Sequence, residues 1–245
     1  MAVPLRVAVT GAGGLIGRFL ADGLADRHDV RALEHADADV TDLDALERAF
    51  EDCQAVVHLA AASHVNAPWD AILPANLVGA HHVYEAAYRA GVRRVVFASS
   101  NHAVGMYEWD DERFANPDRP IELPADVPVR PDSLYGASKA WGEAVGRYYA
   151  ERKGLSVICL RIGWVTDDDR PPVAPPDPTP EEVEIARRGA GMWLSRRDCL
   201  SLVDAGLLAD VRFAIAYGVG DNVGRWFSLD EARDLLGWEP LDGAR

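Results

Sequence analysis

The stretch Leu5-Arg-Val-Ala-Val-Thr-Gly11-Ala-Gly-Gly-Leu-Ile-Gly17 decides the fold that this sequence predicts. A β-branched run ends at Gly11, Gly14 and Gly17 follow at intervals of three, and the glycines lead into an apolar helical pattern. Strand, glycine turn and helix in this order form a dinucleotide-binding unit, because glycines let the backbone approach a pyrophosphate and the helix N-terminus offers free N–H groups. We therefore expect a nucleotide in contact with Gly11, Gly13, Gly14, Leu15, Ile16 and Gly17.

Strand-like and helix-like patterns alternate up to residue 161, which predicts an α/β fold with a Rossmann-type, doubly wound parallel sheet. The expected strands cover residues 5–10, 29–33, 55–61, 92–98, 155–161 and 211–217, and a short further strand is expected to close at Asp39-Val40. The expected helices cover residues 15–24, 43–50, 69–90, 135–153, 181–188, 200–208 and 229–236. Residues 107–132, 166–180 and 193–198 read as irregular, the first two as surface loops or lids.

Glu34 lies at the expected end of the second strand, where an acid can accept hydrogen bonds from the adenosine ribose. Its carboxylate would repel a 2′-phosphate, which favours NAD over NADP. The alternative is an ordinary solvated glutamate at a strand end. Asp39 and Val40 are placed where a side chain could reach the adenine.

Tyr135 and Lys139 are four residues apart, so on a helix they project from one face. Lys139 is one of only two lysines in the chain, and an ammonium beside a phenol stabilises the phenolate. This would bring the pKa of Tyr135 down towards the range of a general base. The alternative is an amphipathic helix with a half-buried tyrosine and a solvated lysine. Ser99-Ser100-Asn101-His102 ends a buried strand, where ligands bind in open α/β sheets.

Composition excludes several other classes of protein. The net charge of −14 argues against nucleic-acid binding, which needs a basic surface. No apolar run is long enough for a membrane span, and the N-terminus lacks the features of a signal peptide. Three widely spaced cysteines read as reduced core thiols, which indicates a cytoplasmic protein. No spacing of metal ligands is present, so we expect no metal.

Taken together, Thr10-Gly11-x-x-Gly14-x-x-Gly17, His58-Leu59-Ala60-Ala61, Asn76, Ser99-Ser100 and Tyr135-x-x-x-Lys139 resemble the extended short-chain dehydrogenase/reductases, the NAD-dependent epimerase/dehydratase family. The final Leu236-Gly-Trp-Glu-Pro240 is similar to that family's closing segment, so the resemblance covers the whole chain. It implies that NAD also touches Leu59, Ala60, Ala61, Asn76, Tyr135 and Lys139. It further implies an NAD-binding Rossmann domain over residues 1–162, which includes the catalytic helix, and a small substrate-binding part over residues 163–245 that completes the sheet.

Within the family, Phe97–Gly105 and Arg130–Gly136 are similar to uronate dehydrogenases and to archaeal-type NAD-dependent glucose-6-phosphate dehydrogenases. Ser63 matches a substrate-contacting serine of the uronate enzymes, whereas Trp164 stands where they have a serine. The C-terminal part is small for a UDP or GDP moiety, which favours a small sugar. A uronate and a sugar phosphate both stay open as the substrate.

The resemblance implies oxidation of the anomeric C1 hydroxyl of a small acidic sugar to its lactone. Tyr135 would take the hydroxyl proton while hydride passes to the nicotinamide, and Lys139 would hold the nicotinamide ribose. Ser100, Asn101 and His102 would position the sugar, and Arg188 would fork onto its carboxylate or phosphate. An arginine in solvent at a helix end is the alternative for Arg188.

Two other functions remain open from the sequence. One is a sugar epimerase or dehydratase, which would return the hydride, and the other is a non-catalytic NAD(P)-binding sensor. The expected partner is a small sugar, with no membrane. The helices near residues 76–90 and 133–150 match those through which family members pair, which predicts a homodimer or higher homo-oligomer.

Overall fold

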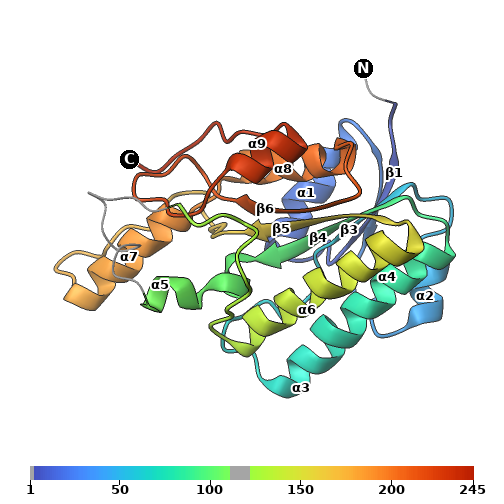
Figure 1. The fold of residues 1–245 in the computed structure, drawn as a ribbon, viewed down its shortest axis with the longest axis horizontal. Coiled ribbons are helices and arrows are strands. Elements are labelled where there is room, and N and C mark those ends of the chain that lie inside the picture. Colours follow the sequence, from blue (N-terminus) through green and yellow to red (C-terminus); the bar gives the residue numbers. More distant parts are fainter. Residues whose placement is uncertain (1–2, 111–121) are drawn as a thin grey trace.

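A six-stranded parallel sheet forms the centre of the molecule (Figure 1). The computed structural model describes residues 3–110 and 122–245. The strands are β1 (Arg6–Thr10), β2 (Asp29–Leu33), β3 (Ala55–His58), β4 (Arg94–Ser100), β5 (Ser156–Ile162) and β6 (Phe213–Gly218), in the spatial order β2-β1-β3-β4-β5-β6. The order reverses between β1 and β3, and such a switch point leaves a crevice at the carboxyl ends of the strands.

Helices cover both faces of the sheet, so the predicted doubly wound α/β fold is confirmed. On one face lie α1 (Leu15–Ala25), α8 (Arg196–Leu208) and α9 (Asp230–Leu236), and on the other lie α2 (Leu43–Ala49), α4 (Gly79–Arg89) and α6 (Leu134–Tyr148), as Figure 1 shows. The short α3 (Trp69–Ile72) and the π-helical η1 (Leu73–Val78) lead into α4, and η4 (Tyr149–Lys153) extends α6. At the carboxyl side of the sheet lie the 3-10 helix η2 (Asn101–Val104), α5 (Met106–Asp110) and α7 (Pro180–Met192).

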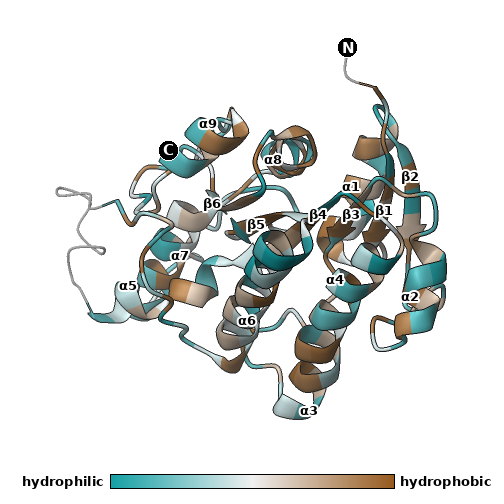
Figure 2. Cartoon of the chain, turned by 45° about the vertical axis from the view of Figure 1, so that its right-hand side comes forward, coloured by the Kyte–Doolittle hydropathy of each residue, from teal (hydrophilic) through white to brown (hydrophobic). Residues whose placement is uncertain are grey.

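Alternate residues of the strands enter two separate apolar clusters. Val7 and Val9 pack under α1 and α8, whereas Ala8 between them packs under α2 and α4. Because both faces are covered, the middle residues of the central strands are mostly apolar, as in buried parallel strands. Figure 2 shows these strands in brown between helices that carry both teal and brown residues. In the described part of the chain, no helix is both long and apolar enough to cross a membrane.

The short strand predicted at Asp39-Val40 is wrong, and β2 is an edge of the sheet. Oδ1 of Asp39 accepts hydrogen bonds from the backbone N–H of Thr41 at 2.8 Å and from its hydroxyl at 2.9 Å. Such local side-chain bonds satisfy the backbone in a turn and compete with strand pairing.

Three helices also differ from the prediction. Helix α7 covers Pro180–Met192 where residues 181–188 are expected, and it ends where Trp193 pairs with Trp164. Helix α8 begins at Arg196 and not near residue 200, because the Ser195 hydroxyl caps it by accepting the backbone N–H of Asp198 at 3.1 Å. Residues 106–110 form α5, although the sequence predicts an irregular segment from residue 107. The middle of that segment, residues 111–121, lies outside the described residues. The division at residue 162 stays a prediction, and β6 from the second part pairs with β5 of the first.

Candidate active site

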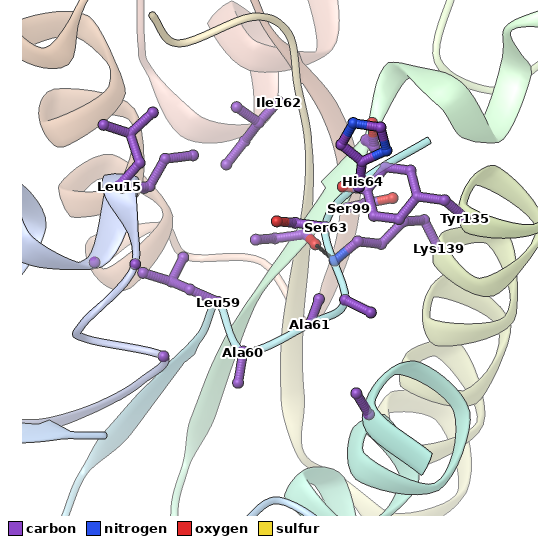
Figure 3. Close-up of a pocket in the computed structure, with 18 of the residues that line it drawn as sticks. Leu15, Leu59, Ala60, Ala61, Ser63, His64, Ser99, Tyr135, Lys139 and Ile162 are labelled. Carbon is purple, nitrogen blue, oxygen red and sulfur yellow. Dashed lines mark hydrogen bonds between the residues drawn. The ribbon is translucent and has the colours of Figure 1, made fainter. Parts of the chain in front are cut away.

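A cavity of about 1100 Å³ opens at the carboxyl ends of the strands, where the switch point places it. One end is lined by the glycine turn after β1, and the other by residues 163–165 and Met192. Between them lie the ends of β3 and β4 and the first turns of α6 (Figure 3). The predicted residues that line it are Gly11, Gly13, Gly14, Leu15, Ile16, Gly17, Glu34, Val40, Leu59, Ala60, Ala61, Ser63, Ser100, Asn101, His102, Tyr135 and Lys139.

The glycine turn forms a cradle that side chains would fill. Gly11 has φ +73°, and a Cβ there would lie 2.7 Å from the backbone nitrogen of Ala60. A Cβ at Gly17 would lie 2.2 Å from the carbonyl oxygen of Gly11. Helix α1 starts at this cradle with Gly14 as its N-cap and no side-chain capping bond, so its first N–H groups are available to an anion.

Glu34 faces this cradle from the end of β2. A Cβ built on Gly13 would lie 3.2 Å from the carboxyl carbon of Glu34, so the carboxylate sits directly over the turn. Asp39 and Asn76, which are also predicted to touch the cofactor, do not line the cavity. Asn76 instead binds the loop after β3 from behind, where it accepts the N–H of Ala62 at 2.7 Å and donates to the Ser138 hydroxyl at 2.8 Å.

Tyr135 and Lys139 project from α6 into the cavity, toward the loop that carries Ser63 and His64 (Figure 3). The Ser133 hydroxyl caps the helix by accepting the N–H of Gly136 at 3.0 Å, which fixes where α6 starts. The Lys139 ammonium donates to the carbonyl oxygen of Ala98 at 2.7 Å and lies 5.5 Å from the centroid of the Tyr135 ring. The predicted pair is therefore built on one rigid helix face.

Burial moves both pKa values away from their ordinary range. Burial raises the pKa of Tyr135, while the neighbouring Ser100 hydroxyl works in the opposite direction. Burial also lowers the pKa of Lys139 to about 8, against the attraction of Glu143. The sequence predicts a lowered pKa for Tyr135, whereas the structure gives a raised one, because desolvation of the phenolate outweighs the hydrogen bond with the Ser100 hydroxyl.

A buried ion pair fixes α6 against the sheet. The Arg161 guanidinium of β5 donates to both carboxylate oxygens of Glu143, at 2.8 and 2.9 Å, and the Ser99 hydroxyl donates to one of them at 2.6 Å. Glu143 lies one turn after Lys139 on the same face. The same face of α6 thus carries Tyr135, Lys139 and the anchor that ties it to β4 and β5.

Polar groups at the end of β4 surround the position opposite Tyr135. The Ser100 hydroxyl accepts the backbone N–H of His102 at 3.2 Å, and Nδ2 of Asn101 contacts Sδ of Met192 at 2.8 Å. Nδ1 of His102 lies 2.7 Å from Oδ2 of Asp132, and the imidazole meets the Tyr135 ring edge-on at 5.8 Å between centroids. Asp132 thus fixes the orientation of the His102 imidazole through Nδ1. The other ring nitrogen, Nε2 of His102, does not take part in this contact.

Arg188, the predicted anion fork, is not among the residues that line the cavity. Its guanidinium is paired with the carboxylate of Glu108 from α5, and it lies over the Trp109 ring at 4.7 Å from the centroid. Met192, one helical turn later on α7, does reach the cavity. Arg188 therefore lies one turn from a cavity residue but outside the cavity lining, and its partner Glu108 is 80 residues away in sequence.

No role is predicted from the sequence for four residues near the site: His64, Asp132, Ile162 and Val165. His64 lines the cavity beside Tyr135 (Figure 3), and its only sequence signal is its place in the loop after β3. Asp132 precedes the helix cap Ser133, which makes it look like part of the cap. Its contact with His102 joins residues that are distant in sequence and could not be read from any local pattern.

Known proteins resemble this chain along most of its length. Residues 7–166 match the NAD dependent epimerase/dehydratase family. The chain is 40% identical to L-arabinose 1-dehydrogenase (NAD(P)(+)) of Haloferax volcanii, over 98% of this chain and 97% of that protein. It is 37% identical to the NAD-dependent glucose-6-phosphate dehydrogenase of the same organism, over 97% of this chain and 94% of that protein. A mutant of uronate dehydrogenase from Agrobacterium tumefaciens, complexed with NAD, has a TM-score of 0.80 at 30% identity, over 98% of this chain and 86% of that chain.

Proposed function

Since the chain belongs to the NAD dependent epimerase/dehydratase family, we propose that it oxidises the C1 hydroxyl of a small free sugar to the lactone. At the coarser level, the chain is an NAD-dependent sugar dehydrogenase, like the proteins it matches over nearly its whole length. The observation that carries the finer proposal is the meeting of Tyr135, Lys139 and Ser100 in one cavity that begins at a glycine turn.

The residues around the glycine turn fit NAD. The cradle at Gly11 and Gly17 accepts no side chain, and the uncapped N-terminus of α1 suits a pyrophosphate. The Glu34 carboxylate above Gly13 suits the two hydroxyls of the adenosine ribose and opposes a 2′-phosphate. When bound, NAD supplies the acceptor for the hydride that leaves C1.

Tyr135 is the group that removes the proton from the C1 hydroxyl. Burial raises its pKa and the hydrogen bond with the Ser100 hydroxyl opposes that rise, while the Lys139 ammonium 5.5 Å from the ring favours the phenolate. The Ser100 hydroxyl on the opposite side positions the C1 oxygen and orients it toward Tyr135. His102, held by Asp132, and Asn101 provide donors and acceptors for the ring hydroxyls of the sugar.

Two features support a small sugar over a nucleotide sugar. The bulky side chains of Trp164 and Met192 line the same cavity as Tyr135. The chain also covers 94% and 97% of two dehydrogenases whose names give free or phosphorylated monosaccharides. The sequence predicts an acidic sugar because of Arg188, whereas the names of the relatives include a uronate, a sugar phosphate and a neutral pentose.

NADH formation over a panel of sugars tests the proposal. Purified protein with NAD is offered glucose, galactose, L-arabinose, glucuronate, galacturonate, glucose 6-phosphate and UDP-sugars. A dehydrogenase accumulates NADH in proportion to the lactone that is formed. An epimerase or dehydratase converts a UDP-sugar without net NADH, and a sensor binds NAD without turnover, so either result would overturn the proposal.

The role of Glu34 gives a separate test of cofactor choice. We expect kcat/KM for NAD to exceed kcat/KM for NADP. Glu34→Ala should bring the two values closer together, because it removes the repulsion between the carboxylate and the 2′-phosphate of NADP. Asp44→Ala is the control, because Asp44 is an exposed carboxylate on the nearby helix α2 and does not line the cavity. A wild-type preference for NADP would refute this assignment of Glu34.

A further inference from the structure

The ion pair between Arg188 and Glu108 joins two elements that lead to residues lining the cavity. Glu108 belongs to α5, which follows the Ser100–His102 corner, and Arg188 belongs to α7, which ends in the cavity residue Met192. Figures 1 and 2 show α5 and α7 side by side, away from the helices that cover the sheet. The pair therefore joins the two elements that flank the sugar.

The pair is enclosed and held on two sides. The side chain of Glu108 is 12% exposed and that of Arg188 is 23% exposed, so both charges are partly withdrawn from water. The Trp109 ring covers the guanidinium as well, at 4.7 Å. A carboxylate on the sugar would have to take Arg188 from Glu108, which would leave the Glu108 carboxylate unpaired and place a second negative charge beside it.

The described residues that line the cavity include no arginine, and besides His102 their histidines are His35 and His64. Among the described residues that line it, Lys139 is the permanent cation, and its ammonium is committed to the Ala98 carbonyl beside Tyr135. The imidazole of His102 already faces the carboxylate of Asp132. An anionic group on the sugar would therefore meet carboxylates near this pair, whereas a neutral hydroxyl group would not disturb the pair.

We propose that Glu108 is a specificity-determining residue, which occupies Arg188 and thereby directs the enzyme to neutral aldoses over uronates and sugar phosphates. This inference rests on the proposed oxidation of a free sugar. It replaces the acidic substrate that Arg188 suggests from sequence alone, because that expectation requires a cation free to bind the substrate.

Matched sugar pairs test the inference. Galactose and galacturonate differ only in a CH₂OH or carboxylate group at C6, as do glucose and glucuronate, so the ratio of their kcat/KM values isolates the charge. We expect the wild type to favour the neutral member of each pair. Glu108→Gln keeps the size of the side chain and frees the guanidinium, so it should raise kcat/KM for the uronate by roughly 10- to 150-fold, the worth of a charge-assisted fork. The value for the neutral sugar should change by only a few-fold.

Two further variants assign the gain to Arg188. The double variant Glu108→Gln/Arg188→Gln should lose the uronate activity that Glu108→Gln gains. Glu184→Gln is the matched control, because Glu184 pairs with the neighbouring Arg187 on the same helix, and it should leave every ratio unchanged. If Glu108→Gln does not fold or does not bind NAD, Glu108→Ala is used in its place, because alanine favours helix.

The outcomes separate the inference from the proposed function. A wild type that prefers the uronate or sugar phosphate overturns the role of Glu108 and leaves sugar oxidation standing. An unchanged ratio in Glu108→Gln, or a gain that persists in the double variant, overturns it in the same way. Absence of NADH with every free sugar overturns the proposed function, and the inference falls with it.

Discussion

The buried ammonium of Lys139 serves the proposed reaction and at the same time lowers the stability of the fold. Its side chain is only 4% exposed, and its ammonium has one hydrogen bond, to the Ala98 carbonyl. Burial lowers its pKa to about 8, which is a cost to folding whenever the ammonium is charged. A buried cation without a direct carboxylate partner is typical of a residue kept for function.

We expect Lys139→Met to stabilise the protein at neutral pH and to abolish turnover. The folded pKa lies below the unfolded value, so the unfolded chain binds more protons between about pH 8 and 10.5, and wild-type stability gains from Lys139 as pH rises through that window. The methionine has no charge to bury, so its advantage should be largest below pH 8, about 2–3 kcal/mol, and should shrink toward pH 10. Urea unfolding of wild type and variant at pH 7 and pH 9.5 measures the difference in their free energies of unfolding. A variant less stable than wild type at pH 7 would contradict the prediction.

Tyr135→Phe should lower kcat by about 10²- to 10⁴-fold, because it removes the proton acceptor and leaves the ring in place. NAD binding, followed by fluorescence titration, should stay nearly intact. Tyr107→Phe is a control, because Tyr107 is also a partly buried tyrosine on this side of the sheet but does not line the cavity. If the Tyr135 variant retains activity within a few-fold of wild type, another group is the base.

Local spacing made Tyr135 and Lys139 readable from the sequence, because residues four apart share a helix face whatever surrounds them. Arg188 was not readable in this way. Its partner Glu108 is 80 residues away, and only the packing of α5 on α7 shows that the guanidinium is occupied. The same limit applies to the pKa of Tyr135, which depends on burial by the whole cavity and not on the nearby lysine alone.

At the scale of elements, α6 acts as the rigid carrier of the site. Its start is fixed by the Ser133 cap, and its middle is fixed by the buried pair of Glu143 and Arg161. Arg161 also donates to the Ala125 carbonyl at 3.0 Å and contacts the Tyr217 hydroxyl at 3.2 Å, so the pair links α6 to β5, β6 and the segment before α6. The helix itself could be predicted from its capping residue and apolar spacing, but this anchor could not.

We expect Glu143→Ala to destabilise the protein by about 3–5 kcal/mol, because it leaves the fully buried Arg161 guanidinium without its carboxylate. The double variant Glu143→Leu/Arg161→Met should recover most of that loss, since an apolar pair of similar volume is often neutral. Glu151→Ala is the control. Its exposed pair with Arg147 lies at the end of the same helix and should be worth at most about 0.5 kcal/mol. The urea concentrations at the unfolding midpoints of the three variants test this prediction. A double variant no more stable than Glu143→Ala would show that the loss does not come from the unpaired Arg161 charge.

At the scale of the molecule, the two outer helix layers differ in what they expose. Figure 2 shows α4 and α6 side by side on one face of the sheet. Large apolar side chains are exposed along this layer: Trp69, Leu73, Val78, Tyr88, Leu134, Trp141 and Tyr148. The opposite layer consists of α1, α8 and α9. Among the described residues of these three helices, the exposed large apolar side chains are Leu208 of α8 and Leu235 of α9. The helices near residues 76–90 and 133–150, through which the sequence predicts two copies to pair, therefore lie on the more apolar face. The pairing itself stays a prediction.

We expect the chain to form a homodimer through this layer, since a contiguous apolar face on a monomer favours association. Light scattering at micromolar concentration should give about twice the chain mass of 26.7 kDa. Trp141 is 45% exposed in the middle of α6, so Trp141→Glu would bury a charge in a two-fold contact and should shift the protein to monomer. Leu208→Glu introduces the same charge at a site of 46% exposure on the opposite layer and should leave the dimer intact. A wild type that scatters as a monomer, or a Trp141 variant with unchanged mass, would place the interface elsewhere or remove it.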